Sequence, residues 1–122
     1  MPALGELEAR VMRKIWDRGR PVTVRDILSD LERERPIAYT TVMTVMDNLR
    51  KKGWLRREAV GRAYRYEPVV SAEQYGAGLM RQALDASSDR AAVLMHFIED
   101  LSAEEAAAVE EAYRRLTRTS PP

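Results

Sequence analysis

The sequence contains no cysteine and a single histidine, His96. The absence of cysteine excludes disulfide bonds, thiol nucleophiles, iron–sulfur clusters and thiolate zinc sites. One histidine cannot build a histidine-rich metal site, so we interpret His96 as an ordinary helical residue. We therefore expect no metal and no cofactor.

Long apolar runs are also absent. No stretch of about 18 uncharged apolar residues occurs, which predicts that the chain does not insert into a membrane. The first residues lack a basic segment followed by an apolar run, so we expect no secretory signal and a cytoplasmic protein. There is no phosphate-binding glycine loop and no recognisable nucleophile–base motif, and the sequence therefore predicts that the protein is not an enzyme.

Charge is distributed unevenly along the chain. Residues 1–70 carry 15 Lys and Arg against 10 Asp and Glu, whereas residues 71–122 carry 5 against 9. Seven basic residues and one acidic residue, Glu58, fall within 50–66. Such a concentration is typical of polyanion binding, although a solvated basic surface without a partner would have the same composition.

Three short helices are predicted before residue 53. Apolar residues recur at helical spacing over 4–18, and Gly19 and Pro21 end this segment. Thr23 is placed to cap a second helix that ends before Pro36. A third helix is predicted over 39–52, with Gly53 as its stop. The inward side of this helix is expected to consist of Ala38, Val42, Val45 and Leu49.

After Gly53 the spacing of the apolar residues changes from that of a helix to that of a strand. Residues 54–60 and 63–67 alternate in the manner of two strands, with a tight turn at Gly61 and Arg62. A two-stranded hairpin is marginal alone, so one of its faces must pack on the helices. The side chains available for this packing are Trp54, Leu55, Tyr64 and Tyr66.

Helical patterns return after Pro68. Ser71 and Ser102 each begin a capping box, and Ser87 or Ser88 is expected to cap a helix between them, over about 89–100. We expect residues 117–122 to be a frayed tail. The sequence thus predicts a mainly α protein with a small β-hairpin: a winged helix-turn-helix over 1–70 and a helical dimerisation region over 71–122.

Residues 71–122 are too few to bury a good core alone, and a second copy of the chain is the simplest partner for their apolar faces. The alternative is a monomer in which these helices fold back on the first 70 residues. The residues predicted to form the dimer are Tyr75, Leu79, Leu94, Phe97, Ile98, Val109, Tyr113 and Leu116.

The third helix is the candidate reader of double-stranded DNA, because a helix fits the major groove and its first residues reach base edges. No arginine lies near its start, so shape and apolar contacts should contribute to specificity. Basic residues behind it should hold phosphates. The predicted DNA-binding residues are Tyr39, Thr40, Thr41, Met43, Thr44, Asn48, Lys51, Lys52, Arg62 and Arg65.

Some of these residues have other interpretations. The threonine-rich surface could be merely solvated. Met43 and Met46 fit packing better than base contacts, with Met43 the borderline case. Tyr64 and Tyr66 likewise fit packing of the hairpin better than stacking on bases.

Several segments resemble the penicillinase-repressor (BlaI/MecI) family. They are the run Leu4–Glu8 with Val11-Met12 and Ile15-Trp16, the run Ala38–Leu49 with Lys52-Gly53, and Gly61–Tyr66 at the hairpin. The resemblance covers about residues 1–70 strongly and 71–116 more loosely. It implies a homodimeric transcriptional repressor whose winged helix binds a palindromic operator.

In members that control β-lactam resistance, the resemblance also implies a membrane sensor-protease as partner, with cleavage in the dimerisation region at an Asn-Phe pair. The matching pair here is His96-Phe97, of which only Phe97 agrees. A copper-responsive branch of the family carries a cysteine motif that this chain lacks. Two other functions stay open at this point: a protein-interaction module on the same scaffold, and a ligand-sensing regulator that is not induced by proteolysis.

Overall fold

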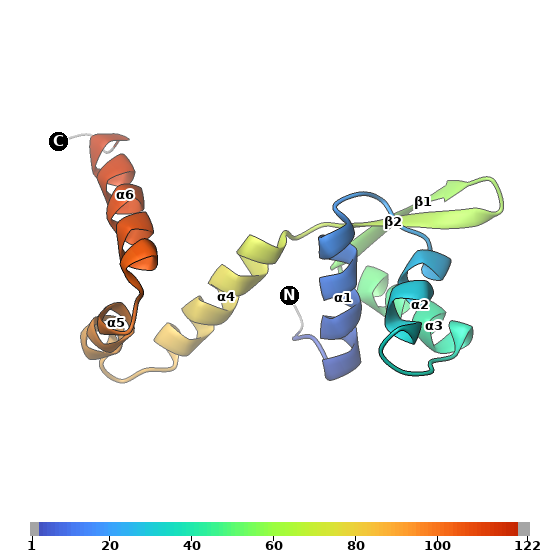
Figure 1. Ribbon diagram of the computed structural model, residues 1–122, viewed down its shortest axis with the longest axis horizontal. Helices are drawn as coiled ribbons and strands as arrows, with labels where there is room; N and C mark the ends of the chain where they lie inside the picture. Colours follow the sequence, from blue (N-terminus) through green and yellow to red (C-terminus); the bar gives the residue numbers. More distant parts are fainter. Residues whose placement is uncertain (1–2, 120–122) are drawn as a thin grey trace. The chain divides into compact units, whose positions relative to one another are not determined.

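The computed structural model describes residues 3–119 and divides the chain into two units, with the boundary between Ala77 and Gly78. Unit 1 contains three helices, a hairpin and the start of a fourth helix (Figure 1). Its elements are α1 (Glu6–Arg18), α2 (Val24–Glu32), α3 (Tyr39–Lys51), β1 (Leu55–Val60), β2 (Ala63–Pro68) and the first residues of α4 (Ala72–Asp85). The boundary thus falls later in the chain than residue 70, the boundary predicted from the sequence.

The predicted caps of the first helices are confirmed. The hydroxyl of Thr23 accepts a hydrogen bond from the Asp26 amide at 3.2 Å, and the Asp26 carboxylate accepts one from the Thr23 amide at 2.9 Å. Gly19 ends α1 with φ 65°, a left-handed conformation that glycine adopts without steric cost. These local signals fix where α1 stops and α2 starts.

Packing of α3 differs slightly from the prediction. Val42, Met46 and Leu49 are buried, whereas Val45 is half-buried and Ala38 is exposed. Residues 42, 46 and 49 follow the four- and three-residue steps of one helical face. The inward side is therefore rotated toward Met46, which acts as the packing residue that its flexible side chain suits.

The two strands pair antiparallel from Leu55 opposite Pro68 to Val60 opposite Ala63. Gly61 adopts φ 63° in the turn between them. Val22, just before α2, exchanges two backbone hydrogen bonds with Tyr66, of 2.9 and 2.7 Å. The base of the hairpin is therefore bonded to the segment that leads into α2.

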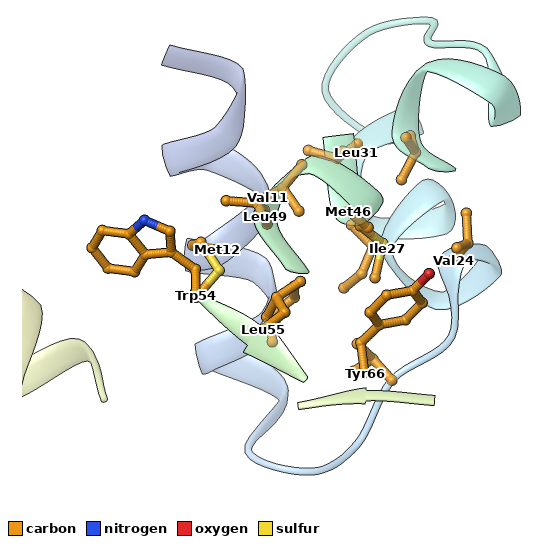
Figure 2. Close-up of a cluster of buried hydrophobic side chains, with 13 residues drawn as sticks. Val11, Met12, Val24, Ile27, Leu31, Met46, Leu49, Trp54, Leu55 and Tyr66 are labelled. Atoms are coloured by element: carbon orange, nitrogen blue, oxygen red, sulfur yellow. The ribbon is translucent and has the colours of Figure 1, made fainter. Parts of the chain in front are cut away.

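The core of unit 1 lies between the three helices and the base of the hairpin (Figure 2). Trp54, Leu55 and Tyr66 contribute to it as predicted, but Tyr64 is 46% exposed. Tyr64, also available for packing on the helices, lies outside this core, and its ring lies 6.4 Å from that of Tyr66 within the hairpin. Residues 58–65, which form the outer half of the hairpin, are all exposed. Helical residues in the core are Val11, Met12, Ile15, Val24, Ile27, Leu31, Val42, Met46 and Leu49.

The start of α4, which belongs to unit 1, packs on the rest of that unit through an aromatic cluster. The ring of Tyr75 lies 5.5 Å from that of Trp16 and 5.4 Å from that of Trp54, centroid to centroid. Trp16 also donates its indole N–H to the carbonyl of Val70 at 2.8 Å. Tyr75, a predicted dimer residue, thus makes its ring contacts inside unit 1.

Unit 2 begins at Gly78 and comprises the rest of α4, α5 (Arg90–Glu99) and α6 (Ala103–Thr119). The capping box of Ser102 with Glu105 is confirmed, as is that of Ser71 with Gln74 at the start of α4. The cap of α5 is Asp89, whose carboxylate accepts from the Ala92 amide at 3.1 Å, and not Ser87 or Ser88. Helix α6 continues through residues predicted to fray, and residues 120–122 of that tail lie outside the described part.

No described residue of unit 2 is buried within this chain. Most of its large apolar side chains are exposed, from 41% for Val93 to 70% for Tyr113, and Leu84 and Leu101 are half-buried. Across residues 3–119, every helix is too short or too polar to cross a bilayer. The exposed apolar residues of unit 2 are Leu79, Met80, Val93, Leu94, Met95, Phe97, Ile98, Val109, Tyr113 and Leu116.

Candidate nucleic-acid interface

The outward side of α3 carries most of the residues predicted to contact DNA. Val42, Met46 and Leu49 hold the opposite side in the core, so the intervening polar residues face solvent. Thr40, Thr44 and Asn48 lie one turn apart and share one stripe. The exposed residues of this surface are Tyr39, Thr40, Thr41, Met43, Thr44 and Asn48.

A groove of about 780 Å³ is lined by residues of this side of α3 and of the β1–β2 hairpin. We call this hairpin the wing (Figure 1). The groove is lined by six of the predicted residues: Tyr39, Met43, Thr44, Asn48, Lys51 and Arg62. Hydroxyl, amide and cationic groups from α3 and the wing therefore face the same space. Thr40 and Thr41 lie at the start of α3 but do not line it.

The side chain of Lys52 points away from the groove and toward α1. Its ammonium lies 2.7 and 2.8 Å from the two carboxylate oxygens of Glu8 in the first turn of α1. Burial alone would raise the pKa of Glu8, but the hydrogen bonds from Lys52 and from the Gly5 amide outweigh it and leave the pKa lowered. Lys52 thus joins α3 to α1 and is not displayed in the groove.

Arg65 also lies outside the groove. Successive residues of a strand point to opposite faces, so Arg65 lies on the face opposite to Tyr64 and Tyr66, which line the groove. Arg65 instead lines a different cavity, together with Pro21 and Arg56. Four of the ten predicted DNA-binding residues thus lie outside the groove: Thr40 and Thr41 on the exposed start of α3, and Lys52 and Arg65 away from it.

Three arginines that were not among the predicted site residues line the groove: Arg25, Arg50 and Arg57. Two of them lie over aromatic rings. The guanidinium carbon of Arg25, in the first turn of α2, lies 5.4 Å from the centre of the Tyr39 ring. That of Arg57, in β1, lies 3.9 Å from the centre of the Tyr64 ring. Both are cation–π geometries. The alternation of the strand could have assigned Arg57 to the face of Tyr64, whereas no local signal identifies Arg25.

Asp47 is the acidic residue of the groove. Its Oδ1 accepts from Arg50 at 2.8 Å and from Arg57 at 3.3 Å, and its Oδ2 lies 3.2 Å from the ammonium of Lys51. Hydrogen bonds from Arg50 and Lys51 lower the pKa of Asp47. A hydrogen bond with Tyr66 is the main cause of a raised pKa for Arg57. Asp47 and Arg57 are therefore charged at neutral pH, and their ion pair connects α3 to the wing.

Comparison with known proteins places the chain in a family. The family model described as Penicillinase repressor matches residues 4–115. The transcriptional regulator BlaI of Mycobacterium tuberculosis is 43% identical over 116 residues, which cover 93% of this chain and 84% of that protein.

Two solved structures share the fold of unit 1. The DNA-binding domain of the repressor BlaI is 26% identical, with a TM-score of 0.54 over 61% of this chain and 89% of that one. The Bacillus licheniformis BlaI monomer in complex with the blaP half-operator is likewise 26% identical over the same shares, with a TM-score of 0.51. The predicted fold class is confirmed, and the family's members are regulators rather than enzymes. The chain belongs to the penicillinase repressor family of winged-helix transcriptional regulators.

Proposed function

We propose that this protein is a transcriptional repressor that binds a palindromic DNA operator as a homodimer, through α3 and the wing. The observation that carries the proposal is the groove between them. It combines the exposed hydroxyl and amide groups of Thr44 and Asn48 with the cations of Arg25 and Arg62. Hydroxyl and amide groups can distinguish base edges, and guanidinium groups bind phosphate.

The relatives support the same function. The curated relative is named a transcriptional regulator, and the Bacillus licheniformis protein was solved on a half-operator. A half-operator implies an operator of two halves for that protein. Carried over to this chain, this favours two copies of unit 1 on one duplex, with half-sites spaced by whole turns of DNA.

Dimerisation through unit 2 would supply the second copy. The apolar residues of α5 and α6 are left exposed within one chain, which is costly for a surface of this extent. Val93, Leu94, Phe97 and Ile98 alone place four large apolar side chains on about one and a half turns of α5. A second copy of the chain would cover them and fix the spacing of the two α3 helices.

The cleavage implied by the family resemblance stays a prediction. The bond between His96 and Phe97 lies inside α5, and both side chains are exposed, that of His96 by 86%. A protease that acted there would have to unwind α5 locally. Cleavage would then remove α6 from the proposed dimer surface and release the operator.

Selection of bound duplexes from a random DNA pool tests the proposal. We expect an enriched sequence with twofold symmetry, and weaker binding to it by the double variant Thr44→Ala/Asn48→Ala. Ser88→Ala, an exposed change in unit 2, is the matched control and should bind as the parent does. Enrichment of no motif, or equal binding by the double variant, would contradict the proposal.

A further inference from the structure

The bonds of Asp47 define a single cluster across the groove, formed by Asp47, Arg50, Lys51, Arg57 and Tyr64. Three cations, two from α3 and one from β1, converge on this one carboxylate at 2.8 to 3.3 Å. Arg57 is held a second time by the ring of Tyr64 in β2. The cluster therefore spans three elements and fixes the wing to α3.

An acidic residue is unexpected at the centre of a surface that binds a polyanion, because it repels phosphates. Asp47 is not needed to start α3 either, since it lies in the second half of that helix, where the helix dipole disfavours a negative charge. Its side chain is 31% exposed and is not part of the core cluster of unit 1. What it does is restrain the cations around it.

We propose that Asp47 sets the DNA specificity of this protein, as a positioning residue that keeps Arg50, Lys51 and Arg57 from gripping phosphates on any duplex. This inference rests on the proposed function and deepens it. Free lysine and arginine side chains bind phosphates irrespective of sequence, and this contact supplies essentially all non-specific affinity. Cations tied to Asp47 can reach phosphates only where α3 and the wing are already seated in their grooves.

The inference predicts the direction in which a substitution of Asp47 changes DNA affinity. Removing the carboxylate in Asp47→Asn frees up to three cations and deletes one repulsive charge. Affinity for a random duplex should rise by about three- to tenfold. The slope of the logarithm of this affinity against the logarithm of the salt concentration should become steeper by about 0.9 for each new phosphate contact. Affinity for the selected palindrome should rise less, so the ratio of the two affinities should fall.

The test compares the full-length protein with its variants on the palindrome selected by the parent and on a scrambled duplex, over a salt series. Asp17→Asn removes the same charge from an exposed position on α1 and should leave slope and ratio unchanged. Asp47→Glu keeps the carboxylate and should restore both values toward those of the parent.

Unchanged salt slopes, an unchanged ratio in Asp47→Asn, or an equal effect of Asp17→Asn would each overturn the inference. Asp47→Ser is a second variant with the same expectation. Loss of folding in both would show that Asp47 acts on stability, which also overturns the inference. A parent protein that prefers no duplex would instead contradict the proposed function, so the two failures are distinguishable.

Discussion

The ammonium nitrogen of Lys52 lies 2.7 Å from Oε1 of Glu8, whereas its neighbour Lys51 faces the groove between α3 and the wing. Two adjacent lysines thus belong to different parts of the molecule. The Lys52–Glu8 pair is half-buried, with side chains 35% and 13% exposed, and it bonds the end of α3 to the start of α1. Lys51 is 64% exposed.

Replacing each lysine by methionine should separate stability from DNA binding. Lys52→Met should lower the free energy of unfolding by about 1 kcal/mol, because Glu8 loses a charged partner. Lys51→Met should change stability by less than about 0.5 kcal/mol but weaken binding to the selected palindrome and reduce the salt slope of that binding by about one per protomer. Urea denaturation and a DNA titration check the two effects. Equal DNA-binding defects in the two variants would contradict this assignment.

Tyr75 offers a test between its two assignments. Tyr75→Ala should lower the free energy of unfolding by about 2 kcal/mol, because the ring is half-buried between Trp16 and Trp54. Tyr75→Phe keeps both ring contacts and should stay within about 0.5 kcal/mol of the parent. A Tyr75→Ala protein of unchanged stability but reduced dimerisation would restore the interpretation made from the sequence.

Acid stability should depend on Glu34. Hydrogen bonds from Lys14 and Arg10 lower the pKa of its carboxyl to about 2, from an ordinary 4.5. A lowered pKa in the folded state stabilises the fold above pH 4.5, and this contribution is lost as the pH falls from 4.5 to about 2. Glu34→Gln should therefore lower the melting temperature at pH 7 and differ little from the parent near pH 2. The exposed change Glu32→Gln is the control, and a Glu34→Gln difference that persists at pH 2 would refute the assignment.

The proposed dimer surface can be tested on α6. Val109→Asp places a charge among the exposed apolar residues, whereas Ala107→Asp places the same charge on the other side of the helix. We expect Val109→Asp to dissociate the dimer in sedimentation experiments and to weaken operator binding by more than tenfold. Ala107→Asp should stay dimeric. A monomeric parent protein, or a dimeric Val109→Asp variant, would contradict the proposal.

Local chemistry allowed much of this fold to be predicted from the sequence. Thr23, Gly19 and Gly61 act within a few residues of their own positions, and each occupies the cap or turn that was expected. The stripe of α1 and the change to strand period after Gly53 likewise reflect regular spacing. Such features need no knowledge of distant parts of the chain.

The sequence does not predict the role of a residue whose contacts come from a distant part of the chain. Lys52 was grouped with the other basic residues because the sequence does not show that Glu8, 44 positions earlier, meets it. Tyr75 looked like part of an amphipathic helix, and only the fold brings it to two tryptophans. Arg25 and Asp47 were missed for the same reason, since their roles depend on α2, α3 and the wing meeting at one groove.

The most direct test of the central claim is a titration of the full-length protein on the palindrome that it selects and on a scrambled duplex of equal length, at one fixed salt concentration. If α3 and the wing read DNA as a dimer, the palindrome should bind at least about 10³-fold more tightly, with two protomers per duplex. Equal affinities for the two duplexes would contradict the account.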